Sequence, residues 1–212
     1  MLKVVDVSVN IQAVQILRDF NMQVKAGEMV GLVGRNGAGK TSLLRTIMGH
    51  LKASSGQLSW CDEDLIASPR HARAGMGIGY MPEDRGLVPE LTVEENICVP
   101  LWVNKKLVLE ERLARVYTIL PELKEMKDRR ALLLSGGQQK LVALARAVAI
   151  GTNLLLLDEP FEGVAPALSQ RLSEVIFGLR DSNLTVLIAQ SELNHAASML
   201  DQEVMIERGA NG

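Results

Sequence analysis

Two hydrophobic patterns alternate along this chain of 212 residues. Short runs that are almost wholly apolar are typical of buried strands, and they occur at 29–33, 77–81, 154–157, 185–189 and 203–206. Longer segments with apolar residues three and four positions apart are typical of helices, and they occupy 42–51, 166–179 and 192–200. Strands and helices that alternate in this way predict an α/β fold with a mainly parallel sheet.

Two kinds of segment fall outside this alternation. Residues 2–9 and 17–24 alternate apolar and polar positions, which predicts an antiparallel β layer beside the main sheet. A later block has helical periodicity throughout, and Thr92 with Glu95 has the pattern of a capping box at its start. The predicted parts of a single domain over 1–212 are an α/β core, 1–83 and 151–212, and an inserted helical subdomain, 84–150.

The composition indicates a soluble globular protein, with 47% hydrophobic and 23% charged residues. The formal net charge is −2 and the Lys and Arg residues are scattered, so we expect no broad basic face and no nucleic acid among the partners. No apolar run reaches the roughly 18 residues of a membrane-spanning helix. Asp6 interrupts the stretch where a signal peptide would be apolar, and Cys61 and Cys98 lack CxxC spacing, so a cytoplasmic location is expected.

The glycine-rich turn after the first apolar strand predicts a phosphate-binding loop. Three glycines let its N–H groups turn inward, and the following helix adds the positive end of its dipole. Lys40 is expected to reach the β- and γ-phosphates of a nucleotide, and Thr41 to bind Mg²⁺. An ordinary turn is the alternative, but the four fixed positions arise by chance in roughly one such chain in a hundred. The candidate nucleotide-binding residues are Gly34, Arg35, Asn36, Gly37, Ala38, Gly39, Lys40, Thr41 and Ser42.

A second candidate element is the apolar strand that ends in Asp158 and Glu159. Such a strand places both carboxylates at the carboxyl edge of the sheet, where α/β folds bind ligands. Asp158 is expected to hold Mg²⁺ through water, and Glu159 is the candidate catalytic base that polarises the attacking water. The alternative is a strand that ends in a solvated acidic turn.

Residues 134–138, Leu-Ser-Gly-Gly-Gln, form a third element, which we call the signature segment. Ser135 can cap a helix that begins near Gln138, while Gly136 and Gly137 leave the first N–H groups of that helix uncovered, as in an anion-binding site. Taken alone, an ordinary helix cap explains the segment better.

In this order, and over essentially the whole chain, the three elements resemble the ATP-binding subunit of an ABC transporter. The resemblance implies a P-loop nucleoside triphosphatase that uses ATP and Mg²⁺ and hydrolyses ATP to energise transport. It also implies that two subunits pair head to tail, as a homodimer or heterodimer, with ATP between the Lys40 loop of one and Ser135, Gly136, Gly137 and Gln138 of the other. Implied partners are transmembrane permease subunits and, indirectly, a periplasmic substrate-binding protein, which would place the chain on the inner face of the cell membrane.

Three further segments, 79–85, 91–96 and 159–166, are similar to the short ATPase subunits of importers for branched-chain amino acids. This likeness implies uptake of branched-chain or other hydrophobic amino acids. Urea-type importers share much of the same sequence, and partner proteins choose the substrate. Two other classes stay open: a soluble ABC ATPase that acts on ribosomes or DNA, and a nucleotide-binding subunit with little hydrolysis.

Four features depart from the wider family pattern. One is Ala165, which replaces the usual aspartate of the loop that crosses the dimer. Glu83 stands where most members have a Mg²⁺-sensing glutamine, and its carboxylate can still ligate the metal. Gln190 stands where most have a catalytic switch histidine; it can donate a hydrogen bond to a phosphate oxygen but cannot become cationic. Residues 10–14 lack the aromatic side chain that usually stacks on adenine, which leaves only apolar contact from Ile11 or Val14.

The replacements at Glu83, Gln190 and Ala165 also occur in the branched-chain amino acid subfamily, so they support that placement rather than an inactive enzyme. The family places a groove for the cytoplasmic helices of the permease beside Glu83. Val88, Leu101 and Trp102 are the candidates to line this groove, and the alternative for Leu101 and Trp102 is a place in the core.

Overall fold

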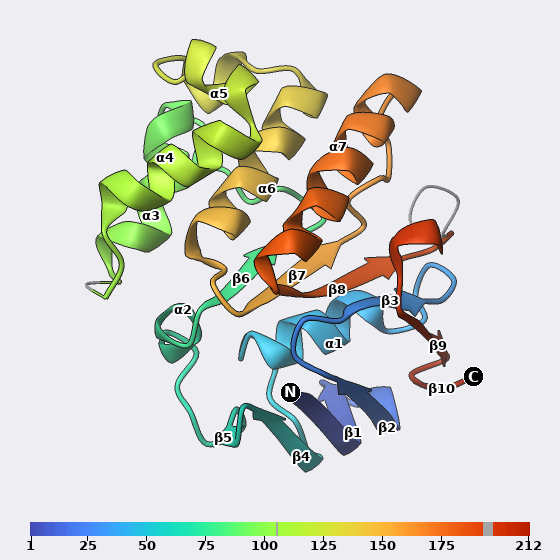
Figure 1. The fold of residues 1–212 in the computed structure, drawn as a ribbon. Coiled ribbons are helices and arrows are strands. Elements are labelled where there is room, and N and C mark those ends of the chain that lie inside the picture. The colour runs from blue at the N-terminus through green and yellow to red at the C-terminus, as the bar shows by residue number, and fades with distance from the viewer. Residues whose placement is uncertain (105, 193–196) are drawn as a thin grey trace.

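The computed structural model describes residues 1–104, 106–192 and 197–212, which form two β-sheets and a layer of helices (Figure 1). The strands are β1 (Leu2–Ile11), β2 (Val14–Val24), β3 (Met29–Val33), β4 (Ser55–Trp60), β5 (Glu63–Asp64), β6 (Ile78–Met81), β7 (Leu154–Asp158), β8 (Thr185–Gln190), β9 (Gln202–Glu207) and β10 (Ala210–Asn211). The α-helices are α1 (Lys40–Ile47), α2 (Ala72–Gly75), α3 (Val93–Trp102), α4 (Leu109–Ile119), α5 (Pro121–Glu125), α6 (Gly136–Ile150) and α7 (Pro166–Gly178). Short 3-10 helices occupy Ala131–Leu133, Leu179–Ser182 and Ala197–Met199.

The larger sheet has the strand order β10-β9-β3-β8-β7-β6. Its neighbouring strands run parallel except for β10 and β9. The smaller sheet, β2-β1-β4-β5, is antiparallel throughout. Helix α1 lies between the two sheets, and the other long helices cover the opposite face of the larger sheet (Figure 1). This arrangement confirms the predicted fold class.

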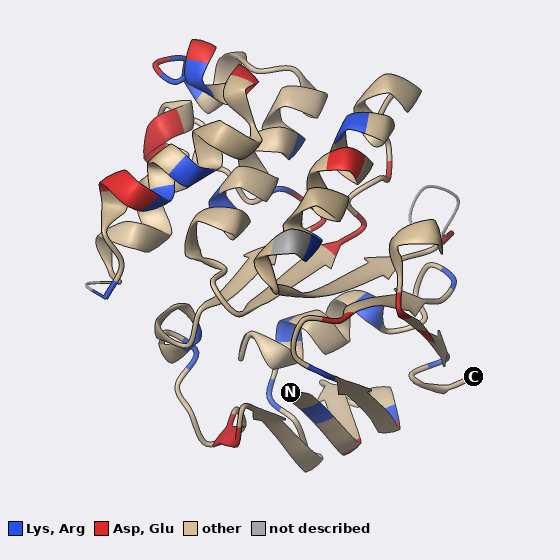
Figure 2. Ribbon diagram, in the orientation of Figure 1, with Lys and Arg blue, Asp and Glu red and all other residues tan. Residues whose placement is uncertain are grey.

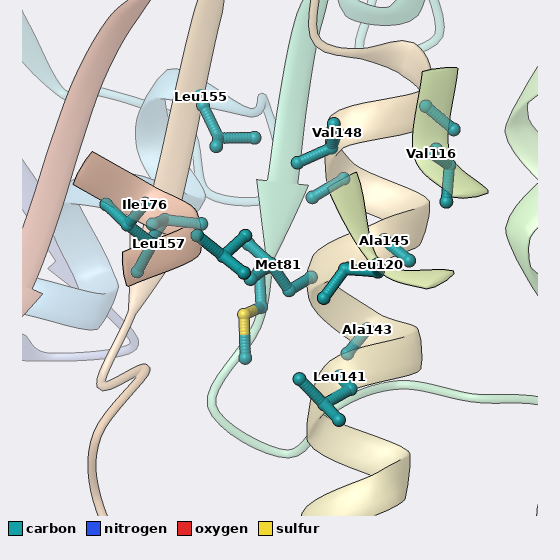
Figure 3. Close-up of a cluster of buried hydrophobic side chains, with 14 of the residues drawn as sticks. Met81, Val116, Leu120, Leu141, Ala143, Ala145, Val148, Leu155, Leu157 and Ile176 are labelled. Atoms are coloured by element: carbon teal, nitrogen blue, oxygen red, sulfur yellow. The ribbon is translucent and has the colours of Figure 1, made fainter. Parts of the chain in front are cut away.

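Strand β7 separates two hydrophobic cores. Leu154 and Leu156 pack toward α1 and the smaller sheet, whereas Leu155 and Leu157 pack toward the helices on the other face. All four side chains are fully buried, as expected for a parallel strand covered on both sides. Figure 3 shows the second core, where side chains from β6, β7, α4, α6 and α7 meet.

Side-chain hydrogen bonds at helix ends add to the packing of the helical layer. The predicted capping box at the start of α3 is confirmed: Thr92 Oγ1 accepts from Glu95 N at 3.2 Å, and Glu95 Oε2 accepts from Thr92 N at 2.8 Å. At the carboxyl end of α6, the Arg112 guanidinium from α4 donates to the carbonyls of Ala149 and Val148, each at 2.7 Å. A cation at this end also complements the helix dipole.

Two predicted helices need correction. The first ends at Ile47 rather than four residues later, because Gly49 takes a left-handed backbone (φ +75°) that turns the chain out of the helix. In the predicted helix 192–200, residues 193–196 lie outside the described residues. The part that is described contains only the single 3-10 turn Ala197–Met199.

Acidic and basic residues are interspersed along both the sheets and the helices (Figure 2). Within the described ranges, no helix combines the length and the apolar character that crossing a bilayer requires. The division into a core and an insert at residues 84–150 stays a prediction.

Candidate functional site

The phosphate loop, residues 34–41, connects β3 to α1 at the carboxyl edge of the larger sheet. Gly37 (φ +80°) and Gly39 (φ +112°) have left-handed backbones, which L side chains rarely adopt. A Cβ at Gly34 would collide with the backbone oxygen of Ile206 in β9. The shape of the loop therefore requires glycine at each of these positions.

Lys40 joins the loop to the candidate catalytic base. Its Nζ donates to Gly34 O at 2.5 Å and to Ser191 Oγ at 3.1 Å. The same ammonium lies 3.0 Å from Glu159 Oε1, and both side chains are only 5% exposed. A buried ion pair needs such additional hydrogen bonds to offset its loss of hydration. An anionic phosphate in this loop would compete with Glu159 for the ammonium.

Ser191 is a site residue that sequence reasoning missed. Its N–H donates to Glu159 Oε2 at 3.2 Å, and its hydroxyl lies 2.7 Å from Glu159 Oε1 and 2.6 Å from Asn36 Oδ1. Lys40 and Ser191 together satisfy both carboxylate oxygens of Glu159. The one signal in the sequence was the place of Ser191 directly after an apolar strand, at the same sheet edge as Asp158.

Asp158 is fully buried, and two hydroxyl groups hold its carboxylate. Thr41 Oγ1 donates to Oδ1 at 3.1 Å, and Tyr80 OH donates to Oδ2 at 3.2 Å. Burial raises the pKa of Asp158 to about 6; the two hydrogen bonds lower this pKa, and the charges of Glu83 and Glu159 raise it. Burial, and then the Asp158 charge, raises the pKa of Tyr80, so the phenol stays a protonated donor.

Thr41 and Asp158 fit the requirements of Mg²⁺. A hydroxyl and a carboxylate side by side are the hard oxygen ligands that this ion prefers. In the part of the chain that the structure describes, no group of three or more His, Cys, Asp or Glu side chains is placed to hold a metal. Mg²⁺ commonly takes one or two protein ligands and completes its shell with water and phosphate oxygens, so this small donor set suits it.

A cavity of about 700 Å³ opens beside Asp158. Glu83 lines it and is exposed, so it shares the cavity with the Thr41–Asp158 pair. The predicted groove residues lie next to the cavity rather than in its wall: Leu101 is buried, and Val88 and Trp102 are 40% and 53% exposed. The core alternative is therefore right for Leu101 and wrong for Trp102. The helical layer contributes Val99, Pro100 and Val103 instead, which lie on another side of α3 and just beyond its end.

Gln190 ends β8 with its side chain buried. Its backbone oxygen accepts from Gly34 N at 3.4 Å, which places it beside the phosphate loop. Its Oε1 has no hydrogen-bond partner among the described residues. A buried unsatisfied amide oxygen costs about 1–3 kcal/mol, and such an exception is a sign of a functional position.

The signature segment begins α6 with the predicted serine cap. Gln138 N donates to Ser135 Oγ at 3.3 Å, and Ser135 N donates to Gln138 Oε1 at 3.0 Å. Gly137 is packed tightly, since a Cβ there would lie 2.6 Å from Leu168 Cδ2 in α7. Among the described residues, no hydrogen bond or ion pair joins this segment to the phosphate loop. The two candidate phosphate-binding elements, the loop and the signature segment, are therefore separate from each other within one chain.

The predicted contacts for a nucleotide base lie at the tip of the β1–β2 hairpin. Ile11 and Val14 pair across this tip and are 41% and 60% exposed. Strand β2 then passes the phosphate loop, where a Cβ at Gly39 would lie 3.4 Å from Ile16 O. The hairpin tip thus offers an aliphatic surface near the loop, with no aromatic side chain from residues 10–14.

A glycine-rich loop between a strand and a helix, with a buried lysine and two carboxylates at the same sheet edge, defines a P-loop nucleoside triphosphatase. A family model described as ABC transporter matches residues 17–162. The chain belongs to this family, and it is an ATP-binding, ATP-hydrolysing subunit with the cassette fold of that family.

Similar proteins carry out more than one kind of transport. The chain is 37% identical to the high-affinity branched-chain amino acid transport ATP-binding protein BraG of Pseudomonas aeruginosa, over 92% of this chain and 84% of that one. It is 34% identical to the lipopolysaccharide export system ATP-binding protein LptB of Escherichia coli, over 92% and 82%. A nucleotide-free ATP-binding cassette from an ABC transporter matches in structure with a TM-score of 0.85 and 25% identity, over 100% of this chain and 89% of that one.

Proposed function

We propose that this chain hydrolyses ATP with Glu159 as the general base and Lys40 as the phosphate-binding cation, to energise uptake of branched-chain or other hydrophobic amino acids. The contact of 3.0 Å between these two side chains inside the phosphate loop is the observation that carries the catalytic part. ATP draws the Lys40 ammonium toward its phosphates, because two phosphates carry more charge than one carboxylate. Glu159 is then free to accept a proton from the attacking water.

Thr41 and Asp158 are the residues that would hold Mg²⁺, with Glu83 reaching it directly or through water from the shared cavity. When bound, the ion neutralises charge on the phosphate oxygens. Gln190 has an Oε1 without a hydrogen-bond partner among the described residues. We propose that this side chain orients the attacking water beside the γ-phosphate. The backbone N–H groups of residues 34–42 bind the remaining phosphate oxygens.

The signature segment supports a head-to-tail dimer. Among the described residues, Ser135 and Gln138 are paired with each other, whereas the N–H groups of Gly136 and Gly137 at the start of α6 have no hydrogen-bond partner. An anion from outside the chain satisfies such groups. We infer that a second ABC ATPase subunit, identical or homologous, supplies that anion as its bound ATP. Closure of the pair on ATP is then a population shift driven by the tighter binding of ATP to the closed state.

The remaining partners are transmembrane permease subunits and, indirectly, a periplasmic substrate-binding protein. The cavity beside Asp158 is the proposed groove for cytoplasmic helices of the permease, because it joins the metal ligands to the helical layer. This role places the chain on the cytoplasmic, inner face of the cell membrane as a peripheral subunit.

The likeness to BraG favours amino acid import as the substrate class. The likeness to LptB, only slightly weaker, supports a second candidate, the ATPase of a lipopolysaccharide exporter. Reconstitution of the chain with each type of permease in vesicles separates the two. Import predicts ATP-dependent accumulation of labelled leucine, which the export candidate does not.

The catalytic assignment is tested by Glu159→Gln in the permease complex. The amide cannot accept the proton, so we expect turnover to fall at least about 100-fold while Mg·ATP is retained in a stable dimer. Size-exclusion chromatography with light scattering measures the dimer, and released phosphate measures turnover. Glu174→Gln, at an exposed position on α7, controls for the loss of a carboxylate. Undiminished turnover in the Glu159 variant would overturn the assignment.

A further inference from the structure

Lys140 is a buried cation that the proposed chemistry does not use. It lies in the second turn of α6, and its side chain is 3% exposed. Burial, followed by the charge of Arg85, lowers the pKa of this ammonium. Among the described residues it makes no ion pair, and its hydrogen bonds go to backbone carbonyls. Burying a charge is unfavourable, and an apolar side chain of similar volume is often no less stable in such a place.

The two carbonyls that Lys140 contacts belong to the loop that carries the general base. Nζ donates to Glu159 O at 2.8 Å and to Glu162 O at 2.5 Å. Glu159 itself has a left-handed backbone with φ +46°, which is unfavourable for a residue with a Cβ. Its N–H donates to Ala189 O at 2.9 Å, so the backbone of Glu159 is held from β8 on one side and from α6 on the other.

Helix α6 therefore contacts two parts of the proposed mechanism, the nucleotide of the other subunit and the loop of the general base. Its first turn, capped by Ser135, is the end that faces the nucleotide of the other subunit in the proposed dimer. Its second turn holds the backbone of Glu159 through Lys140. Because a helix moves as a rigid element, a shift of the first turn of α6 also moves Lys140 in the second turn.

We propose that Lys140 is a positioning residue. It connects α6 to the loop of the general base, so that binding of the other subunit's nucleotide at Ser135 orients Glu159 of the same chain. The inference rests on the proposed function. It explains why a cation, rather than an apolar side chain, occupies this buried position. It also predicts that Glu159 of one chain promotes hydrolysis only when the signature segment of the same chain binds the nucleotide of the other subunit.

Lys140→Met in the permease complex tests the proposal, since methionine keeps most of the side-chain length without the donors. A misaimed base costs on the order of 100-fold in rate, so we expect kcat to fall by about that factor, while KM for ATP changes by less than about threefold. Lys140→Arg retains donors for both carbonyls and should recover kcat to within about fivefold of the wild type.

Arg112→Met is the matched control, because among the described residues Arg112, like Lys140, donates only to backbone carbonyls. Its acceptors, Val148, Ala149 and Gly151, lie at the opposite end of α6. Only the Lys140 variant is expected to lower kcat, whatever the two methionine substitutions do to the melting temperature. Equal losses of kcat in the two variants, or no rescue by arginine, would show that Lys140 only supports the fold. If the methionine variant does not fold, Lys140→Arg and Lys140→Gln carry the comparison.

The transmission step has its own test. If Lys140 passes on what Ser135 senses, the loss of kcat in the double variant Ser135→Ala, Lys140→Met should equal the larger single loss rather than the product of both. Multiplied losses would overturn the link while leaving the positioning role. A wild-type complex without any ATP turnover would refute the proposed function itself, and an active wild type with an unaffected Lys140→Met would refute only this inference.

Discussion

Replacing Asp158 by asparagine should stabilise the nucleotide-free protein at neutral pH while removing its activity. The unfolded chain loses the Asp158 proton near 3.8, and burial raises the folded pKa to about 6. The folded state therefore binds more protons between these values, and the free energy of unfolding falls as the pH rises from about 4 to about 6. Above that window, roughly two pKa units correspond to about 3 kcal/mol of lost stability.

Asparagine removes this loss but does not match every contact of the carboxylate. Thr41 and Tyr80 both donate to Asp158, and an amide offers one acceptor oxygen and a donor group in place of two acceptors. One hydroxyl must turn to accept, which costs about 1 kcal/mol. The net gain is about 2 kcal/mol at about pH 7.5, or about 4–8 °C in melting temperature for a chain of this size.

Thermal unfolding with EDTA and without nucleotide measures this gain at several pH values. The advantage of Asp158→Asn should disappear at about pH 4, because the folded carboxyl is protonated there and the unfolded one, with a pKa of 3.8, is only partly ionised, so little of the loss remains. Asp128→Asn, at an exposed position, controls for the change in net charge. A variant that is no more stable than the wild type at neutral pH, or a gain that does not depend on pH, would refute the reasoning.

Two further substitutions test the nucleotide site. Ile11→Tyr should tighten ATP binding by about tenfold, because stacking on a base is worth about 1–3 kcal/mol; fluorescence titration measures it, and equal affinity would count against the aliphatic base contact. Gly34→Ala should destabilise the protein by about 2 kcal/mol, since its Cβ meets the Ile206 carbonyl. Gly37→Ala has open space and pays only for its positive φ, about 1 kcal/mol. Chemical denaturation compares the two alanine variants, and equal costs would contradict the predicted clash.

Local patterns made several elements predictable. The strand before Asp158 is covered on both faces, and its four consecutive leucines indicate this burial directly in the sequence. The caps at Thr92 and Ser135 depend on residues three positions apart, so sequence spacing is enough to find them. The phosphate loop is predictable for the same reason, since Gly37 and Gly39 are required by the positive φ angles of the loop's own backbone.

Other features depend on residues that meet only in the folded chain. The place of Ser191 after an apolar strand does not by itself predict its contacts with Glu159, because those contacts join the ends of two strands that pair only in the folded sheet. The exposure of Trp102 follows from the side of α3 that packs against α6. The sequence of α3 does not specify that side, because apolar residues occur on more than one side of the helix. The break between α4 and α5 at Leu120 has a cause in Pro121, yet the helical periodicity expected for this block continues across it and does not mark the boundary.

The order of strands in the larger sheet also bears on how the protein is made. The strand that leads into the phosphate loop lies between β8 and β9, and Gly209 donates to the Ala38 carbonyl at 2.8 Å. Both neighbours are synthesised long after the loop, since β8 begins at Thr185 and β9 ends at Glu207. A growing chain thus carries its glycine-rich turn without these two strands until both have been made, and nucleotide capture is deferred until then.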